Sequence, residues 1–355
     1  MKILITGICG FAGNVLALEL KRKMDQLEIL GIDNLSRPGS EQNRRAFKRH
    51  GISFLHGDIR NPSDLAVLPK ADWVIDAAAN PSVLAGHSGV SSSRQLMEHN
   101  LVSTIHVLEY CKRHGAGLVM LSTSRVYSLE RLAALPLKVQ DSAFVPRFGE
   151  TSEPGLSEHG VAENFSTQSP LSLYGAAKLA SEALILEYGF AFDLPVFVNR
   201  CGVLAGAGQF GKADQGIFGF WVPSYRYRRP LKYIGFGGTG SQVRDCLHPR
   251  DLASLVAMQI SHPEKAGKTL NVGGGWRNSL SLAQLSEWCA ARFGPHQVQP
   301  DPTPRRYDVP WLVLDSRRAE AEWNWRPATA FESILNEIAD HAERHPEWLD
   351  LSDAT

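Results

Sequence analysis

The sequence lacks an excess of either charge, because 37 Lys and Arg residues are balanced by 37 Asp and Glu residues. A zero formal charge gives no electrostatic reason to expect nucleic acid or an anionic membrane as a partner. The chain also lacks an apolar run long enough to cross a bilayer. Its start, Met-Lys-Ile-Leu-Ile-Thr-Gly, has neither the separate apolar segment nor the cleavage site of a signal peptide. We therefore expect a cytoplasmic protein without nucleic-acid or membrane partners.

Cysteine is scarce and scattered along the chain. None of the cysteines has CxxC spacing, which predicts reduced structural thiols rather than disulfides. A zinc site needs clustered ligands, and the sequence has no such cluster, so we expect no metal. The five cysteines are Cys9, Cys111, Cys201, Cys246 and Cys289.

Short apolar runs alternate with longer helical patterns through the first half of the chain. This alternation is typical of right-handed βαβ units and predicts an α/β fold, a Rossmann-type doubly wound parallel sheet. Helices are expected between the strands, for example at Gly13–Lys23, Asn100–Arg113 and Leu173–Tyr188. The expected strands are Ile3–Thr6, Ile29–Asp33, Ser53–His56, Trp73–Ala77, Leu118–Ser122, Phe197–Cys201 and Thr269–Val272.

The pattern changes after about Gly202, where Pro, Gly and aromatic residues become frequent. Two amphipathic helices follow, near Leu282–Phe293 and Phe331–Arg344, and indicate a smaller C-terminal substrate-binding lobe. We expect residues 1–202 and about 243–274 to form the dinucleotide-binding domain, and about 203–242 and 275–345 the lobe. The run 128–169 is irregular and rich in Pro, Gly and Ser, which is typical of a functional or partly disordered loop.

A glycine-rich turn follows the first expected strand, reading Gly7-Ile8-Cys9-Gly10-Phe11-Ala12-Gly13. Glycine lets the backbone turn tightly and approach a pyrophosphate, and the next helix offers its N–H groups and positive dipole end to the phosphates. Alone, such a turn indicates only a tight connection. Here it follows a strand, opens a helix, and is followed by Asp33 at about the 20-residue distance of a ribose-binding acid. These three features predict a dinucleotide site.

Asp33 also bears on the choice of cofactor. A carboxylate accepts hydrogen bonds from a free ribose 2′-hydroxyl and repels a 2′-phosphate, so we expect NAD, although Arg37 lies near enough to counter that repulsion. Asp58 follows the third strand and is either an adenine-side residue or a plain turn residue. The predicted cofactor site comprises Gly7, Gly10, Phe11, Ala12, Gly13, Asp33, Asn34, Arg37, Asp58, Ile59, Ala77, Ala78 and Ala79, with Tyr174 and Lys178.

A possible acid/base pair, Tyr174 and Lys178, opens a helical stretch. Residues at i and i+4 share a helix face, so the phenol and the ammonium group can point into one site. A free tyrosine has a pKa near ~10, and an adjacent ammonium group with an oxidised nicotinamide would favour the phenolate. A bare YxxxK indicates only a half-buried tyrosine and a surface lysine. A third partner strengthens the prediction, because Thr123 ends a sheet strand at the edge where such sheets bind ligands.

Together, the GxxGxxG turn, the Ser122-Thr123-Ser124-Arg125-Val126-Tyr127 strand end and the YxxxK helix resemble the extended short-chain dehydrogenase/reductase family, the nucleotide-sugar epimerases and dehydratases. The resemblance covers nearly the whole chain. It implies that Thr123 binds the reacting sugar hydroxyl, that Tyr174 moves its proton, and that Lys178 holds the nicotinamide ribose. Two features depart from the family: Ser128 replaces a usual glycine, and the long 128–169 segment could reshape the mouth of the pocket.

The resemblance also implies that Arg244 meets the diphosphate of the substrate, and that Arg305 does so too. For either arginine, a surface ion pair is an equal alternative. The predicted substrate residues are Thr123, Ser124, Arg125, Gln209, Gln215, Arg244 and Arg305.

The residues after Thr123 bear on the reaction. Dehydratases of this family carry Asp-Glu there, as the acid and base for elimination, whereas this chain has Ser124 and Arg125. An epimerase needs only the Thr, Tyr and Lys set. Asp33-Asn-Leu-Ser-Arg37, Gln209-Phe210 and Asp214-Gln215-Gly216 resemble one subgroup, the CDP-paratose (tyvelose) 2-epimerases, which implies a CDP-sugar as the substrate.

Three alternatives remain open at the level of sequence. A C4 epimerase or a reductase of another nucleotide sugar would use the same residues. A dinucleotide-sensing interaction protein would also bind the cofactor, although such proteins commonly lose the Tyr or the Lys. From the resemblance we expect a homodimer, in which the two helices Asn100–Arg113 and Leu173–Tyr188 pair with their copies.

Overall fold

A parallel sheet of seven strands forms the centre of the computed structural model, which describes residues 1–87 and 91–352. Its strand order is β14-β10-β5-β4-β1-β2-β3. All seven expected strands are present in this one sheet, with ends that differ from the predictions by at most one residue, so the predicted Rossmann-type fold is confirmed. The strands are β1 (Lys2–Thr6), β2 (Glu28–Asp33), β3 (Ser53–His56), β4 (Trp73–Asp76), β5 (Gly117–Thr123), β10 (Val196–Cys201) and β14 (Lys268–Val272).

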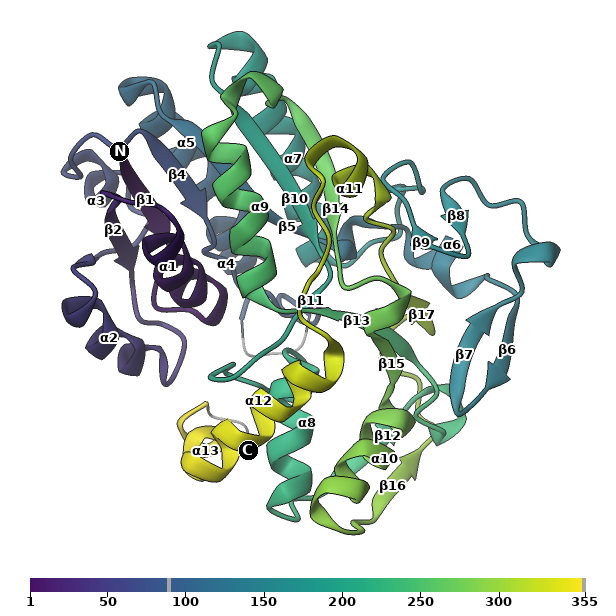
Figure 1. The fold of residues 1–355 in the computed structure, drawn as a ribbon. Coiled ribbons are helices and arrows are strands. Elements are labelled where there is room, and N and C mark those ends of the chain that lie inside the picture. The colour runs from purple at the N-terminus through teal and green to yellow at the C-terminus, as the bar shows by residue number, and fades with distance from the viewer. Residues whose placement is uncertain (88–90, 353–355) are drawn as a thin grey trace.

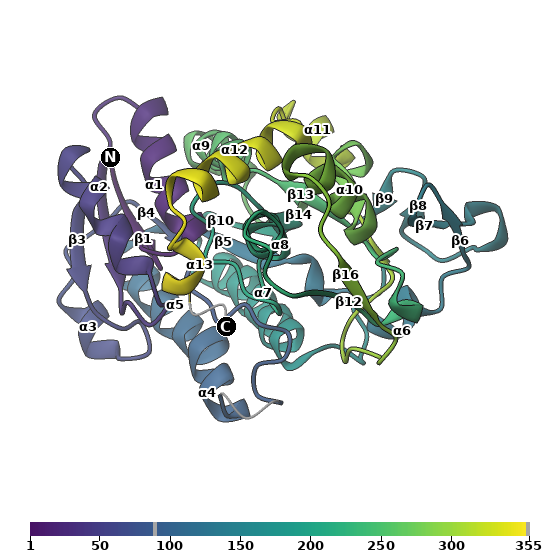
Figure 2. The same ribbon diagram turned by 90° about the horizontal axis from the view of Figure 1, so that it is seen from below.

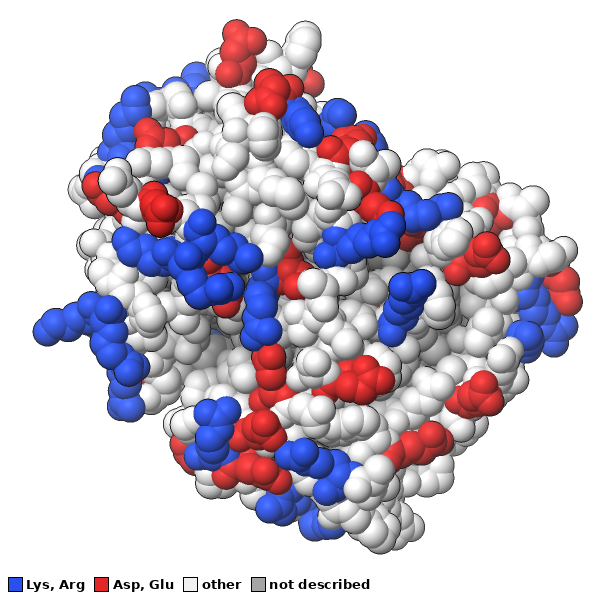
Figure 3. Space-filling model, viewed as in Figure 1, with Lys and Arg blue, Asp and Glu red and all other residues white. Residues whose placement is uncertain are grey.

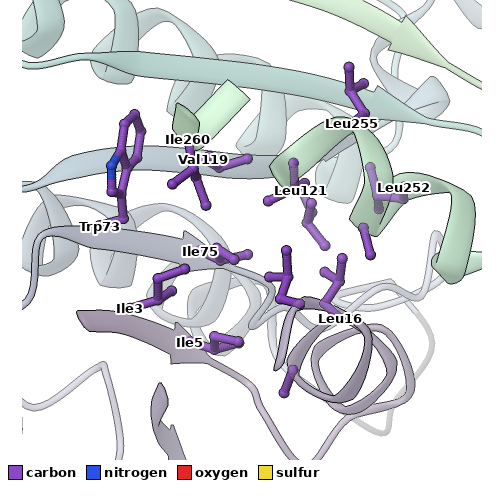
Figure 4. Close-up of a cluster of buried hydrophobic side chains, with 14 of the residues drawn as sticks. Ile3, Ile5, Leu16, Trp73, Ile75, Val119, Leu121, Leu252, Leu255 and Ile260 are labelled. Carbon is purple, nitrogen blue, oxygen red and sulfur yellow. The ribbon is translucent and has the colours of Figure 1, made fainter. Parts of the chain in front are cut away.

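Helices cover both faces of this sheet (Figures 1 and 2). On one face, α1 and α9 enclose a core of branched aliphatic side chains from β1, β4 and β5 (Figure 4). On the other face, α3, α5 and α7 enclose a second core. Burial on both faces is why the strands read as continuous apolar runs rather than alternating ones. The helices are α1 (Phe11–Lys23), α3 (Pro62–Ala66), α5 (Ser103–His114), α7 (Leu173–Ala191), α9 (Pro249–Ser261) and α11 (Arg317–Trp323).

The order of the strands positions a ligand crevice. From β1 the chain moves outward to β2 and β3 and then returns to β4 on the other side of β1. Loops that leave β1 and β4 therefore part at the carboxyl edge of the sheet, and open α/β sheets bind ligands at such a switch point. The glycine-rich turn follows β1, and the residues Ala77, Ala78 and Ala79 follow β4.

A smaller lobe packs below the carboxyl edge of the sheet (Figure 1). Its aromatic and aliphatic core lies between α8, α10 and α12, and the two amphipathic helices predicted here have the bounds expected from the sequence. The division of the chain into two domains stays a prediction. The elements are β11 (Val203–Leu204), β12 (Leu231–Ile234), β13 (Val243–Leu247), β15 (Ser279–Ser281), β16 (Val298–Asp301), β17 (Trp311–Leu312), α8 (Ile217–Arg226), α10 (Leu282–Phe293), α12 (Phe331–Arg344) and α13 (Trp348–Leu351).

The 128–169 segment is more regular than the sequence suggested. It folds into one short helix and two hairpins, and the first hairpin is docked on the lobe by backbone contacts. The Phe144 N–H donates to the Ser241 carbonyl at 2.8 Å, and the Ser281 hydroxyl donates to the Ser142 carbonyl at 2.8 Å. The elements are α6 (Leu129–Ala133), β6 (Leu137–Gln140), β7 (Ala143–Pro146), β8 (Leu156–Ser157) and β9 (Gly160–Val161).

Two further short helices, α2 (Arg44–Arg49) and α4 (Ser93–Met97), lie in the first half of the chain, and a π-helical turn, Glu98–Val102, leads from α4 into α5. Within the described residues, the structure contains no helix with the length and apolarity that a membrane span requires. Basic and acidic side chains are interspersed over the face seen in Figure 3.

Candidate active site

Two adjoining cavities lie at the carboxyl edge of the sheet. The larger has a volume of about 380 Å³ and reaches from the glycine-rich turn to the lobe. The smaller, of about 110 Å³, lies over the ends of β2 and β4. Both are lined by Gly10, Arg37, Ala77 and Ala79, so they form one continuous site.

The glycine-rich turn leaves no room for side chains. Gly7 has a φ of +63°, and a Cβ there would lie 2.7 Å from the Cα of Ala78. A Cβ on Gly13 would lie 2.3 Å from the Gly7 carbonyl oxygen. These contacts let α1 begin at Phe11 directly above the turn, with its first N–H groups at the cavity wall. The arrangement fits the pyrophosphate of a dinucleotide.

Asp33 lies at the end of β2, in the smaller cavity. Its carboxylate accepts the N–H groups of Cys9 (2.9 Å) and Leu35 (2.8 Å), which fix its position beside the turn. Burial raises the pKa of Asp33 above its usual value, and these backbone hydrogen bonds oppose the rise. A carboxylate held in this way suits a ribose hydroxyl and disfavours a 2′-phosphate.

The other residues predicted at the ribose end are engaged with the protein. Arg37 donates to the Phe210 carbonyl in the lobe, so its guanidinium group is directed across the site. Asp58 accepts hydrogen bonds from Asn34 (3.0 Å) and from the Arg60 side chain. Partial burial opposes the ionisation of Asp58, but these bonds outweigh it and lower its pKa. Asn34, Asp58, Ile59 and Ala78 all line the smaller cavity, as expected of the adenosine end.

Thr123 and Tyr174 meet in the larger cavity. Thr123 ends β5, its hydroxyl accepts the Arg125 N–H at 3.2 Å, and it also hydrogen-bonds to the Tyr174 hydroxyl. Tyr174 is in the first turn of α7, which packs closely on the Thr123 turn because the next residue is glycine. A Cβ on Gly175 would lie 2.2 Å from the Arg125 carbonyl oxygen. Glycine at this position thus lets the phenol reach the threonine.

Burial governs the ionisation of Tyr174 in the protein without its cofactor. Burial raises its pKa to about 12, and the Thr123 hydrogen bond only partly opposes this. Lys178 is buried one turn along α7 and lines neither cavity. Burial lowers the pKa of Lys178, while Asp76 and Glu182 support its charge. The charge of Lys178 is therefore supported by two carboxylates, and its effect on the phenol together with an oxidised nicotinamide stays a prediction.

The larger cavity is lined by five arginines and two carboxylates: Arg37, Arg125, Arg244, Arg305 and Arg306, with Asp214 and Asp308. Arg244 is committed within the protein: its guanidinium group donates to Asp308 Oδ1 (2.5 Å) and to the carbonyl of Val309 (2.7 Å). This is one of the two alternatives expected for Arg244, an ion pair, although the pair is mostly buried rather than exposed at the surface. Arg305 donates to the Ala213 carbonyl at 3.0 Å.

The remaining predicted substrate residues line the same cavity. Ser124 follows Thr123 in the 3-10 turn η3 (Ser124–Val126). The Gln209 side chain is bonded to the backbone, donating to the Leu204 carbonyl (2.6 Å) and accepting the Gly219 N–H (3.2 Å), so it shapes the loop. Gln215 lies in the same loop. No residue of 128–169, all of which the structure describes, lines either cavity, so this segment does not shape the pocket mouth as expected.

Among the residues of the larger cavity that the sequence did not predict as site residues are Asp308, Gln242 and Asp214. Asp308 belongs to the Arg305-Arg306-Tyr307-Asp308 run, of which only Arg305 was predicted to contact the substrate. Gln242 is 7% exposed, and its Oε1 has no hydrogen-bond partner. Asp214 accepts the Ser82 hydroxyl at 2.5 Å and thereby joins the two loops that face each other across the site. Only a fold in which distant loops converge reveals these contacts.

The C-terminal helix supports the loop that closes the cavity. Trp348 in α13 stacks on Phe210, with ring centroids 5.2 Å apart, and its indole N–H donates to the Gln209 carbonyl at 3.1 Å. Since Arg37 holds the same Phe210 backbone from the cofactor side, the loop is fixed from two directions.

Comparison with known proteins agrees with this geometry. Residues 3–273 match the model of the NAD dependent epimerase/dehydratase family. CDP-paratose 2-epimerase of Salmonella typhi is 31% identical, over 96% of this chain and 98% of that protein. dTDP-glucose 4,6-dehydratase of Salmonella typhimurium is 24% identical over 98% and 94%. UDP-glucuronic acid 4-epimerase from Bacillus cereus, solved with UDP-glucuronic acid and NAD, has a TM-score of 0.76 at 22% identity, covering 97% and 99%.

Proposed function

The chain belongs to the NAD-dependent epimerase/dehydratase family, and from this premise we propose that it is an epimerase of a nucleotide-activated sugar. NAD is its cofactor. The observation that carries the proposal is the hydrogen-bonded pair of Thr123 and Tyr174 in a cavity continuous with the dinucleotide site. A sugar hydroxyl bound there would face a proton acceptor and the nicotinamide end of the cofactor together.

Each residue of the pair has a distinct task in this proposal. Bound NAD supplies the oxidation, accepting a hydride from the sugar carbon and giving it back. Thr123 holds the oxygen on that carbon, and Tyr174 takes the hydroxyl proton and later returns it, so the cycle leaves no net change in the cofactor. Lys178 holds the nicotinamide ribose. Because burial raises the pKa of Tyr174 to about 12 in the free protein, the positive charge of an oxidised nicotinamide would favour the phenolate when the cofactor is bound.

Epimerisation fits the turn after Thr123 better than elimination does. Dehydration needs an acid and a base beside the keto-sugar, and this turn presents Ser124 and Arg125 there. A hydroxyl and a guanidinium group that stays protonated at neutral pH cannot serve as that pair. The keto-sugar then has one productive outcome, which is to turn over and accept the same hydride on its other face.

As the finer proposal, the substrate is a CDP-linked 3,6-dideoxyhexose that inverts at C2. The 31% identity to the Salmonella typhi enzyme supports this, as do the Gln209-Phe210 and Asp214-Gln215-Gly216 motifs. Gln242 adds support from the base end. Its Oε1 is buried without a partner, and the apolar residues Phe218 and Leu285 line the same cavity. A buried acceptor without a partner suits the amino group of cytosine.

We also propose that residues 203–242 and 275–345 form the nucleotide-sugar lobe and that Ser124, Arg125, Gln209, Gln215, Arg244 and Arg305 contact the substrate. The protein is further proposed to act as a homodimer in the cytoplasm. All five cysteines are free and buried, which suits a reducing compartment.

The proposal is tested with CDP-sugar deuterated at C2. The label should remain in the product, heavy-water solvent should add none, and the ring couplings in the NMR spectrum should report inversion at C2. Inversion at C4, or activity confined to UDP- or GDP-sugars, would overturn the finer proposal alone. Stoichiometric consumption of reduced cofactor would indicate a reductase, and absence of turnover with every nucleotide sugar would indicate a dinucleotide-sensing protein.

A further inference from the structure

Arg125 is the least compensated charge in the larger cavity. Its Nη1 is buried and has no hydrogen-bond partner. Burial and, to a smaller extent, repulsion by Arg244 lower the pKa of Arg125 to about 10, while Asp308 opposes the fall. The group is still protonated at neutral pH. A guanidinium nitrogen that is buried without an acceptor is costly, so the free site favours the binding of an anion beside Arg125.

The neighbouring residues do not supply that anion. Arg244 already donates to Asp308 and to two backbone carbonyls, and Arg305 donates to the Ala213 carbonyl. Five guanidinium groups and two carboxylates line the cavity, and of the carboxylates Asp308 pairs with Arg244 while Asp214 accepts the Ser82 hydroxyl. The missing negative charge has to come with the substrate, and a diphosphate carries it.

The position of Arg125 indicates which phosphate it meets. It lies two residues after Thr123 in η3, at the sugar end of the cavity, and its backbone is clamped by α7 at Gly175. Gln242 and Leu285, by contrast, belong to the lobe side of the same cavity. Because this clamp holds the backbone of the turn, the guanidinium group projects from a rigid base.

We propose that Arg125 binds the phosphate nearest the sugar and serves as the pivot about which the oxidised ring turns. This inference rests on the proposed function. It also supports reaction at C2: the sugar-side phosphate is attached at C1, so a phosphate held beside the Thr123 turn keeps C2 close to Thr123 and Tyr174. C4 lies on the opposite side of the ring.

The test compares the binding of CDP and CMP by calorimetry in wild type, Arg125→Met and Arg125→Lys. CMP lacks the sugar-side phosphate. Arg125→Met should therefore weaken CDP binding by about 10- to 100-fold, the loss of one charge-assisted hydrogen bond, and leave CMP binding nearly unchanged. Arg125→Lys keeps the charge and should retain part of the CDP affinity. Arg131→Met, in the neighbouring α6 and paired with Glu153, is the matched control and should change neither affinity.

A second readout tests the pivot. Without its anchor the keto-sugar should leave before it is reduced again, so reduced cofactor should accumulate during turnover of Arg125→Met and not in the wild type or the control. Weakened CDP binding without this accumulation would overturn the pivot role.

If Arg125→Met loses as much affinity for CMP as for CDP, the assignment to the sugar-side phosphate is wrong. It is also wrong if the wild-type protein binds CDP and CMP with equal affinity. If the protein binds UDP and UMP rather than CDP and CMP, the ratio of diphosphate to monophosphate affinity is measured with the uridine nucleotides. In that case only the proposed base is wrong. Arg125-dependent diphosphate binding without epimerase activity would overturn the proposed function and leave the phosphate contact standing.

Discussion

At the residue scale, Asp33 is expected to select the cofactor because its carboxylate is fixed by the N–H groups of Cys9 and Leu35. Asp33→Asn keeps an acceptor oxygen and removes the charge. NAD should bind less tightly by ~1.5–3 kcal/mol, the contribution of a hydrogen bond to a charged group. The affinity for NADP should fall by less than this, or rise. Fluorescence titrations with the two dinucleotides measure the difference between the NAD and NADP affinities. Wild-type protein that binds both equally well would contradict this assignment.

The phenol oxygen of Tyr174 is expected to be essential for turnover. Tyr174→Phe removes the phenol oxygen and leaves the ring in its buried place in α7. Turnover should fall by roughly 10²-fold or more, as expected for the loss of a general acid/base, with NAD binding and the unfolding temperature retained. Steady-state kinetics with the nucleotide sugar provide the measurement. An active Phe variant would mean that another group moves the proton.

At the scale of elements, the contact between α7 and the η3 turn sets the geometry of the reaction centre. Gly175→Ala would place a Cβ 2.2 Å from the Arg125 carbonyl oxygen, so the helix and the turn would have to separate. Because a small misplacement of reacting groups costs about 10²-fold in rate, turnover should fall at least that far, although the substituted residue is not itself reactive. NAD affinity should be almost unchanged. Full activity would show that the helix has room to move.

The packing of α12 against α13 predicts a dependence of stability on pH. Burial lowers the pKa of His341 from 6.5 to about 4, and the charges of His345 and Arg344 contribute. The ring packs edge-on against Trp348, with centroids 4.7 Å apart. Below pH 6.5 the unfolded chain binds the proton more readily than the folded one, so stability present above that pH is lost as the pH falls toward 4.

His341→Gln should therefore be less sensitive to acid than the wild type. Between pH 7 and pH 4, the wild type should lose up to about 3 kcal/mol more of its free energy of unfolding than His341→Gln loses. The shift of the His341 pKa sets this upper limit. Urea denaturation at several pH values measures it. Parallel pH profiles for the two proteins would exclude His341 as the responsible group.

Elements with strong local patterns could be predicted from the sequence, and those held by distant contacts could not. The strands β1, β4 and β5 read as apolar runs because both faces of the sheet are covered. The β6 strand is short and mostly exposed, with alternating apolar and polar residues, and it forms because its partner β7 docks on the lobe. In the site, the glycine-rich turn and Asp33 stand at characteristic spacings. Asp308 and Gln242 have no such signal, because their neighbours become adjacent only in the fold.

At the scale of the whole molecule, the outer face of α5 and α7 is expected to be the dimer interface. This face exposes Val102 and Ile105, each 37% accessible, together with the small residues Ala180 and Ala183 of α7. Ala180→Arg would place a charge in the centre of the predicted contact, and burial of an unpaired charge is strongly unfavourable. Sedimentation velocity at micromolar concentration should show a dimer for the wild type and a monomer for the variant. A monomeric wild type would contradict the prediction.

The loop at Phe210, held by Arg37 on one side and by Trp348 on the other, has a consequence for metabolism. If the cofactor lies behind this closure, both contacts would have to open before it leaves, and we expect it to exchange slowly. In an epimerase, such a cofactor is regenerated within every cycle and never has to equilibrate with the free pool. For the proposed epimerase, the direction of net conversion would then depend on the concentrations of the two sugars relative to their equilibrium constant. Changes in the cellular ratio of oxidised to reduced dinucleotide, such as those that accompany oxygen limitation, would leave the reaction undisturbed.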